Sequence, residues 1–311
     1  MAWIALDGTN WNRERPHNGD PASTPARGRP RSVSSLRGRT MLMSGGSRGI
    51  GLAIAKKAAT EGANVAIVAK TDKPHPKLPG TIHTAAEEIE AAGGTALPIV
   101  GDVRDEGSVA DAVERTVGEF GGIDLVVNNA SAINLAPMRD LEVKRLDLML
   151  DINLRGTFVL TRAALPSLRE SDHAHVLSLS PPISADHKWL KQHSAYTVAK
   201  YGMSMITLGL AADEADAPIA ANTLWPRTLI ATAAVKNLLG GEQAMRRART
   251  PEIYADSAIA ILRRDPRECS GNSYIDDEVL AEEGITDLSR YQAEDGEELQ
   301  LDLFLDDWPE A

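Results

Sequence analysis

A chain of 311 residues with a formal net charge of −11 can form one large α/β domain, and it lacks the clustered positive charge of a nucleic-acid-binding surface. Its content of 43% hydrophobic and 25% charged residues is ordinary for a globular protein, which excludes disorder throughout. Cys269 is the only cysteine, so the chain forms no intrachain disulfide and no cysteine-rich metal site.

The first residues of the chain show no sign of a folded element. Residues 1–38 are rich in Pro, Gly, Arg and Ser and have neither a helical nor a strand period, so we expect a disordered leader outside the core. The leader lacks the basic and apolar regions of a secretory signal, and no apolar run approaches the roughly 20 residues of a membrane span. We therefore expect a cytoplasmic protein with no membrane span and no nucleic-acid partner.

From residue 40 onward, short apolar runs alternate with amphipathic segments of helix length, which is typical of repeated βα units. Continuously apolar runs indicate strands that are buried on both faces. The sequence predicts an α/β fold with a doubly wound parallel sheet, in a single domain over residues 39–281 with tails at both ends. Strands are expected at 40–44, 63–69, 95–100, 123–129, 174–180, 219–225 and 272–277, and helices at 52–62, 80–92, 106–119, 141–169, 194–213 and 251–263.

The acidic C-terminal tail, residues 282–311, carries apolar residues among its carboxylates. These apolar residues could cap a groove or meet another subunit, and a loosely docked tail is an equal alternative. They are Leu301, Leu303, Phe304, Leu305 and Trp308.

A glycine-rich loop follows the first predicted strand and opens the first helix. In it, Gly45 permits a tight turn, Gly49 lets the backbone approach a pyrophosphate, and Gly51 allows the helix and strand to pack closely. The N–H groups at the start of the helix favour phosphate charge. The spacing is typical of the Rossmann dinucleotide-binding fold. Candidate cofactor-binding residues of this loop are Gly45, Ser47, Arg48, Gly49, Ile50 and Gly51.

The residue after the second strand indicates which dinucleotide binds. An acidic residue there would hold the ribose hydroxyls of NAD, whereas this chain has Lys70. Lys70 and Arg48 together could neutralise a 2′-phosphate, which favours NADP over NAD. Either cation alone could be a solvated surface charge.

Tyr196 and Lys200 are four residues apart, so they share one face of the helix predicted at 194–213. A phenol with a reference pKa of about 10 needs a nearby ammonium to exchange protons near neutrality, and Lys200 can supply that charge.

Taken in order, these motifs resemble those of the short-chain dehydrogenase/reductase family, from about residue 38 to residue 277. The glycine loop SGGSRGIG is followed by the acid of Gly101-Asp102-Val103, by the turn Asn128-Asn129-Ala130-Ser131, and by the helix asparagine of DINLRGTF. The chain then continues with Tyr196 and Lys200.

The resemblance implies a role for each matched residue. Tyr196 would be the proton donor or acceptor, and Lys200 would bind the nicotinamide ribose and lower the tyrosine pKa. Asn153 would hold a water that links Lys200 to solvent. The adenosine half would lie against Asp102 with the adjacent Val103, and against Asn129.

Two departures from the family pattern are expected to line the cofactor or substrate cleft. Ser131 replaces the glycine that usually follows NNA, and Arg227 replaces the glycine of a Pro-Gly turn.

The serine that commonly steadies the substrate oxygen is also missing, because Pro181 occupies its place. Our hypothesis is that Ser180, at the end of the fifth strand, substitutes for it. Ser184 is the other candidate, and both could equally be ordinary loop serines.

His173 and His175 lie on one face of a predicted strand, but no cysteine or acid nearby completes a metal site, so we expect surface histidines and no metal.

The sequence therefore predicts an NADP-dependent oxidoreductase that transfers hydride to or from the carbonyl or secondary alcohol of a small molecule. The family resemblance adds a lipid-like substrate and a homodimer or homotetramer built on the helices at 106–119 and 141–169. The alternative is a non-catalytic NADP(H)-binding protein with a regulatory or structural role on the same fold.

Overall fold

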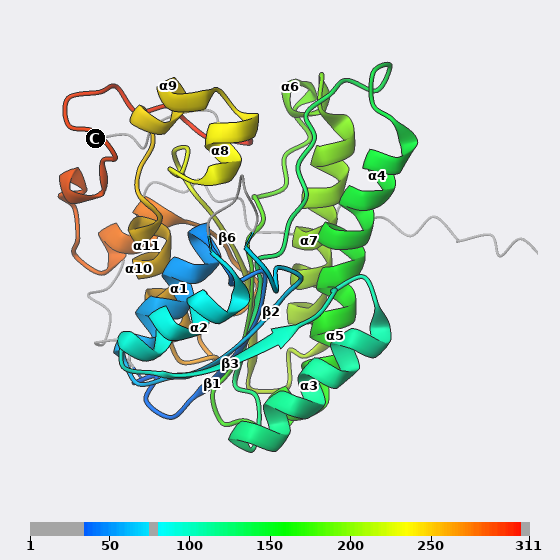
Figure 1. Ribbon diagram of the computed structural model, residues 1–311, viewed down its shortest axis with the longest axis vertical. Coiled ribbons are helices and arrows are strands. Elements are labelled where there is room, and N and C mark those ends of the chain that lie inside the picture. Colours follow the sequence, from blue (N-terminus) through cyan, green and yellow to red (C-terminus); the bar gives the residue numbers. More distant parts are fainter. Residues whose placement is uncertain (1–33, 75–79, 306–311) are drawn as a thin grey trace, which may run out of the picture. The chain divides into compact units, whose positions relative to one another are not determined.

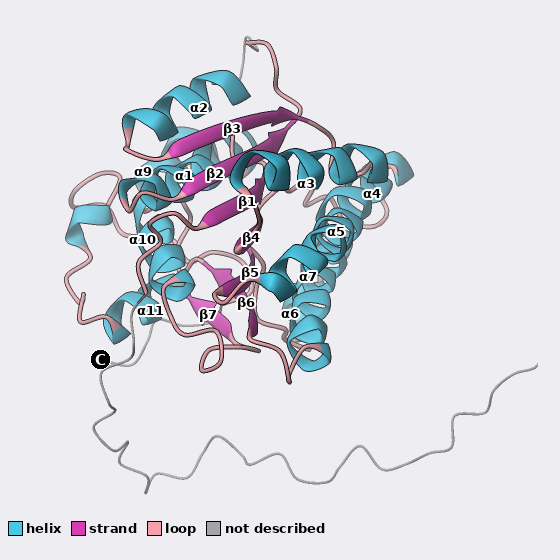
Figure 2. Ribbon diagram, turned by 90° about the horizontal axis from the view of Figure 1, so that it is seen from below, coloured by secondary structure: helices cyan, strands magenta, loops and turns pink. Residues whose placement is uncertain are grey.

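The computed structural model describes residues 34–74 and 80–305, in which seven parallel strands form one sheet with helices on both faces (Figure 1 and Figure 2). The strand order is β3-β2-β1-β4-β5-β6-β7, so the direction of winding reverses between β1 and β4. This arrangement confirms the predicted doubly wound sheet. The strands are β1 (Thr40–Ser44), β2 (Asn64–Ala69), β3 (Thr95–Val100), β4 (Leu125–Asn128), β5 (Ala174–Ser178), β6 (Ile219–Trp225) and β7 (Ser273–Ile275).

The strands from β1 to β6 send alternate side chains into two separate cores. In β1, Met41 and Met43 pack under α1 and α10, and Leu42 packs on the opposite face with residues of α3 and α5. Figure 2 shows these helices as two layers with the sheet between them. The long helices are α1 (Gly49–Thr60), α2 (Ile82–Ala91), α3 (Glu106–Phe120), α5 (Gly156–Glu170), α7 (Ser194–Asp213) and α10 (Pro251–Leu262).

The helix predicted at 141–169 is continuous, but its central part is a π-helix instead of an α-helix. A π-helical stretch, Leu150–Arg155, joins α4 (Val143–Met149) to α5. Such stretches occur often at functional sites. Short elements that the hydrophobic period did not predict are α6 (His187–Leu190), α8 (Ala233–Leu238), α9 (Gly241–Arg246), α11 (Asp276–Glu282) and a 3₁₀ turn, Ser289–Tyr291.

His173 and His175 are buried, so the prediction of surface histidines was wrong. They are 3% and 1% exposed, and their rings bond to the carbonyl oxygens of Leu262 (2.8 Å), the last residue of α10, and Arg264 (3.0 Å), which follows it. Burial lowers the pKa of His175 to about 3, so its ring is neutral. The pair fastens β5 to the C-terminal end of α10. Within the described residues, no three His, Cys, Asp or Glu side chains gather where they could hold a metal.

The tail packs onto the domain as far as it is described. Leu301 forms an antiparallel bridge with Thr228, and Gln292 forms another with Arg249. Phe304 is 3% exposed. The alternative of a loosely docked tail is therefore wrong for residues 289–305, which are attached to the domain by these contacts. The leader over residues 1–33 and Trp308 lie outside the described residues, and the predicted domain boundaries stay predictions.

None of the helices in residues 34–74 and 80–305 has the length and apolar character needed to span a membrane.

Candidate active site

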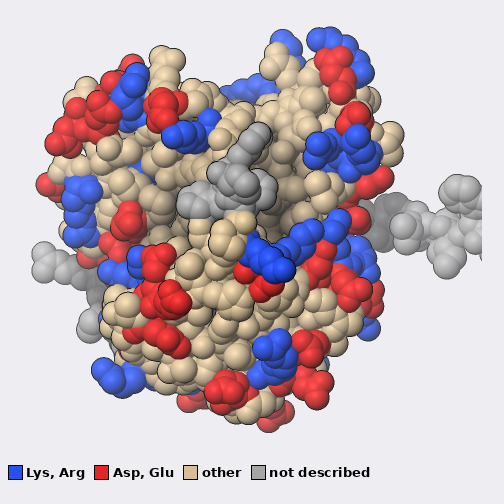
Figure 3. All heavy atoms as spheres, viewed as in Figure 1, with Lys and Arg blue, Asp and Glu red and all other residues tan. Residues whose placement is uncertain are grey.

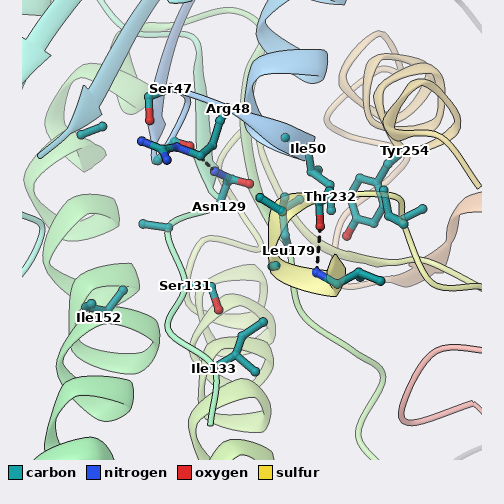
Figure 4. A pocket seen from close by; sticks show the side chains of 18 of the residues that line it. Ser47, Arg48, Ile50, Asn129, Ser131, Ile133, Ile152, Leu179, Thr232 and Tyr254 are labelled. Atoms are coloured by element: carbon teal, nitrogen blue, oxygen red, sulfur yellow. Dashed lines mark hydrogen bonds between the residues drawn. The ribbon is translucent and has the colours of Figure 1, made fainter. Parts of the chain in front are cut away.

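A cavity of about 620 Å³ opens at the carboxyl ends of the strands, where the winding of the sheet reverses. Doubly wound sheets bind their ligands at this position. In Figure 4, Ser47, Arg48 and Asn129 lie together, and Ser131 and Ile133 lie along the segment that leads away from them. Sequence segments far apart, from the glycine loop to the C-terminal tail, therefore share one cavity.

The glycine loop is held against the end of β4 by one side chain. The Asn129 amide donates to the carbonyl oxygens of Ser44 and Gly45, both at 2.9 Å. Gly45 has φ +77°, and a Cβ atom there would lie 2.8 Å from that amide nitrogen. A Cβ atom at Gly51 would lie 2.5 Å from it. Both glycines are needed for this close approach, as the loop motif predicts.

The start of α1 leaves donors available for a phosphate. Arg48 occupies the N-cap position of α1, but its side chain makes no capping hydrogen bond. The first N–H groups of α1 therefore have no side-chain acceptor at this position. Ser47, Gly49 and Ile50 line the cavity at this point, whereas Gly51 does not and serves the packing described above. This geometry suits an anionic group.

Arg48 and Lys70, the two predicted phosphate-binding cations, both line the cavity. Arg48 donates from Nη2 to Thr71 Oγ1 (2.9 Å), and its buried Nη1 has no hydrogen-bond partner in the described chain. Burial lowers the pKa of Arg48. Lys70 Nζ lies 3.4 Å from Asp102 Oδ2. A buried cation that lacks an anion beside it is the environment in which a phosphate would bind.

The carboxylate of Asp102 already has a cationic partner. Arg104 Nε lies 3.0 Å from both of its oxygens, and this hydrogen bond holds the pKa of Asp102 at about 2. Asp102 and Val103 line the cavity, and contact with an adenine remains a proposal for both.

Tyr196 and Lys200 lie on the buried face of α7 and line the cavity, as their spacing predicts. Lys200 Nζ donates to the carbonyl oxygen of Leu179 (2.8 Å) and lies 5.3 Å from the ring centre of Trp225. Burial lowers the pKa of Lys200 to about 8, and the charge of Asp302 opposes this shift. Lys200 is therefore mostly charged at neutral pH.

The environment of Tyr196 differs from the expected one. Burial raises the pKa of its phenol, and the charge of Asp302 raises it further. We expected Lys200 to lower this pKa, but in this structure desolvation dominates. Tyr196 lines the cavity. It is therefore a protonated donor available to a ligand in the cavity.

Asn153, in the π-helical stretch, is fully buried and binds the loop after β4. Its Oδ1 accepts from the Ala132 N–H (2.7 Å), and its Nδ2 donates to the Ala132 carbonyl (3.0 Å). The side chain thus shapes the cavity wall beside Ser131, and its role in holding a water remains a proposal.

The geometry does not support Ser180 as a substitute for the missing serine. Its side chain is fully buried, its hydroxyl accepts from Ser204 Oγ (2.9 Å), and it does not line the cavity. Ser184 accepts from the N–H of Asp186 (3.2 Å) and does not line the cavity either. The packing of β5 against α7 turns the Ser180 hydroxyl into the interior.

Of the two departures from the family pattern, Ser131 lines the cavity as expected and Arg227 does not. The Arg227 guanidinium turns away from the cavity toward Asp277, with Nε 3.1 Å from Oδ2, and also contacts Glu278. The expectation for Arg227 was wrong because α11 supplies these carboxylates.

Sequence reasoning left open whether the apolar residues of the tail cap a groove, and it missed Asp302 in the tail and Thr232 after β6. Asp302, Leu303 and Thr232 line the cavity. The one signal in the sequence was an acid inside the apolar run Leu301–Leu305, which is an unusual place for a carboxylate unless it has a partner.

Comparison with known proteins agrees with this arrangement. A model of the short chain dehydrogenase family matches residues 39–242. The chain is 52% identical over 280 residues to hydroxysteroid dehydrogenase-like protein 2 of Xenopus tropicalis. The aligned residues make up 90% of this chain and 66% of that protein. It thus spans just under two thirds of the length of that curated relative.

Two solved structures share both fold and sequence with the chain. A short chain dehydrogenase from Mycobacterium thermoresistibile is 57% identical with a TM-score of 0.83, over 88% of this chain and 96% of that one. A dehydrogenase from Xanthomonas campestris is 50% identical with a TM-score of 0.85, over 88% of this chain and 100% of that one.

Proposed function

Because the chain belongs to the short chain dehydrogenase family, we propose that it is an NADP-dependent oxidoreductase acting on the carbonyl or secondary alcohol of an apolar, lipid-like substrate. The observation that carries this proposal is the placement of Tyr196 and Lys200 in the same cavity as the glycine loop. Binding of a nucleotide alone would need the loop, with Lys200 at the ribose, but not the phenol of Tyr196.

The residues of the site fit a nicotinamide dinucleotide. The start of α1 would hold its pyrophosphate, and Lys200 its nicotinamide ribose. When bound, the cofactor supplies or accepts a hydride at the carbon of the substrate. In the direction of reduction, Tyr196 donates its proton to the substrate oxygen as the carbon–oxygen double bond becomes single. The positive charge of Lys200 stabilises the tyrosinate that this transfer leaves.

The proposed substrate class follows from the cavity wall beyond Tyr196. Ile133, Leu135, Trp225 and Leu303 line the cavity and pack in one apolar cluster with Tyr196. Such a wall favours the carbon chain of a ketone or alcohol over a sugar or a charged acid.

The test is a steady-state assay of NADPH oxidation with straight-chain methyl ketones from 2-butanone to 2-dodecanone. Catalytic efficiency that rises with chain length supports the proposal, because each buried CH₂ group contributes about 0.8 kcal/mol. Tight NADPH binding without oxidation in the presence of any ketone would instead favour a non-catalytic binding protein.

The cofactor preference forms a separate prediction. We expect NADPH to bind at least tenfold more tightly than NADH, about 1.4 kcal/mol, because Arg48 and Lys70 both face the cavity. Lys70→Asp should abolish or reverse the preference, and the matched surface variant Lys144→Asp should not change it. Fluorescence titration measures both affinities, and equal values in the unmodified protein would contradict the prediction.

We also expect a homodimer or homotetramer. Exposed apolar side chains lie on α4, α5 and α7, which are neighbouring helices, whereas α3 carries none. Val143 is 71% exposed, Phe158 50% and Met205 62%. Burial of such a surface against a copy of itself would remove it from water. Sedimentation that detects only a 33.4 kDa species at micromolar concentration would refute this expectation.

A further inference from the structure

The last described residues of the tail, Gln300–Leu305, form a strap that is fixed to the segment after β6. Leu229 N–H donates to the Gln300 carbonyl (3.0 Å), and Asp302 N–H donates to the Arg227 carbonyl (3.0 Å). The Trp225 indole donates to the Leu303 carbonyl (2.8 Å). These bonds place the backbone of the strap beside the cavity.

The strap is locked in position by Phe304. Its ring packs against Tyr196, Tyr201 and Trp225, with ring centres 6.2, 5.2 and 5.7 Å away. Its φ is +72°, a left-handed conformation that bulky side chains rarely adopt. Such a conformation persists only where the surrounding packing enforces it, and it is concentrated at functional sites.

Locking Phe304 in this way holds Asp302, two residues earlier in the strap, at the active site. Asp302 lines the cavity that Tyr196 and Lys200 also line. One carboxyl oxygen, Oδ1, accepts from the Leu303 N–H (2.6 Å), which leaves Oδ2 as the second polar atom of this side chain. A carboxyl oxygen is thus available to a ligand beside the Tyr196 hydroxyl.

The surroundings of Asp302 favour its neutral form. Burial and the charge of Asp276 raise the pKa of Asp302 to about 7, although the hydrogen bond from the Leu303 N–H and the charge of Lys200 act to lower it. Other titratable groups pack around the strap. Tyr196, Tyr201 and His193 lie against the Phe304 ring, and Tyr254 on α10 interacts electrostatically with Asp302. The cation of Arg227 bonds to Asp277, with Nε 3.1 Å from Oδ2.

Neither Ser180 nor Ser184 lines the cavity, so neither hydroxyl can donate a hydrogen bond to a substrate there. We propose that Asp302, in its protonated form, donates a hydrogen bond to the carbonyl oxygen of the substrate beside Tyr196.

During reduction, Asp302 would not transfer its proton. As hydride reaches the carbonyl carbon, the π electrons move to the oxygen. The oxygen then takes the proton of Tyr196, while Asp302 keeps its own. An ionised Asp302 would repel the charge that develops on that oxygen. This inference rests on the proposed function.

The test compares variants of Asp302 that differ in donor capacity and charge, in the full chain with NADPH and 2-decanone. Asp302→Asn keeps a donor and cannot ionise, and it should retain most of the turnover. Asp302→Leu has similar size and no donor, and it should lower kcat about 10²- to 10³-fold. Asp302→Ala serves as a second variant without a donor if the leucine variant does not fold. Asp295→Leu, at an exposed position of the same tail, is the control.

The pH profile separates a donor from a structural residue. The protonated form is the donor, so reduction should fall as pH rises through the pKa of Asp302, about 7. In Asp302→Asn this fall should vanish, and the later fall from Lys200, with a pKa of about 8, should remain. An asparagine variant as impaired as the leucine one, or a leucine variant with full turnover, would overturn the proposal.

A separate binding measurement tests the role of Asp302 without relying on turnover. Hexanamide offers a carbonyl oxygen that accepts hydrogen bonds but is not reduced, and its binding to the NADPH complex can be followed by nicotinamide fluorescence. The unmodified protein and Asp302→Asn should bind it at least about tenfold more tightly than Asp302→Leu. Equal binding by all three, or none by the unmodified protein, would overturn the role of Asp302. If hexanamide binds in this order but no ketone is reduced, the proposed reaction is wrong and the role of Asp302 as a hydrogen-bond donor stands.

Discussion

Tyr196→Phe should lower kcat for ketone reduction about 10²- to 10⁴-fold while leaving NADPH affinity unchanged. The phenol is the donor that the cavity presents beside Lys200, whereas its ring packs against Phe304 and would do so equally as phenylalanine. Initial rates with 2-decanone and a fluorescence titration with NADPH measure the two quantities. Tyr274→Phe, which removes a phenol outside the cavity, is the matched control. Full turnover in Tyr196→Phe would rule out proton donation by this residue.

Two serine variants complete the comparison with Tyr196→Phe. Ser180→Ala and Ser184→Ala should keep their turnover, because neither hydroxyl lines the cavity. A loss of about 10²-fold in Ser180→Ala, with an unchanged melting temperature, would restore our hypothesis that this serine steadies the substrate oxygen.

Arg227→Met should lower the free energy of unfolding by about 3–5 kcal/mol, since it removes the cation nearest to a buried carboxylate. Arg227 and Asp277 are 5% and 7% exposed, and methionine cannot neutralise Asp277. Arg249 Nη1 lies 3.7 Å from Asp277 and can compensate only in part. Urea denaturation measures the change.

The control for Arg227→Met is Arg246→Met, which breaks only surface ion pairs. Arg246 and Glu294 are both about half exposed, so this variant should cost less than about 1 kcal/mol. An equal loss of unfolding free energy in the two variants would show that breaking the buried Arg227–Asp277 pair destabilises the protein no more than breaking a surface ion pair.

The regular parts of the fold could be predicted from the sequence because their signals are local. The strands at 40–44, 95–100 and 219–225 and the helix at 194–213 have the predicted bounds. A strand buried on both faces must be continuously apolar, and that pattern is visible in a few residues. The glycine loop and the Tyr196–Lys200 pair could likewise be predicted, because each lies within one turn or one helix.

The sequence could not show where side chains point when distant segments decide it. Ser180 ends a strand as predicted, but its hydroxyl turns inward because Ser204 of α7 bonds to it. Arg227 leaves the cleft because α11 places Asp277 beside it. His175 is buried and neutral because the end of α10 covers it. In each case the partner lies more than 20 residues away in sequence, so no local pattern contains it.

The sequence by itself determined the sheet, the phosphate loop and the proton-donor pair. Only the tertiary structure decided that the tail reaches the site, because a short irregular segment has no period of its own and takes its conformation from what it packs against. Phe304 adopts φ +72° among the rings of α6, α7 and β6, and this places Asp302 in the cavity more than 100 residues after Tyr196.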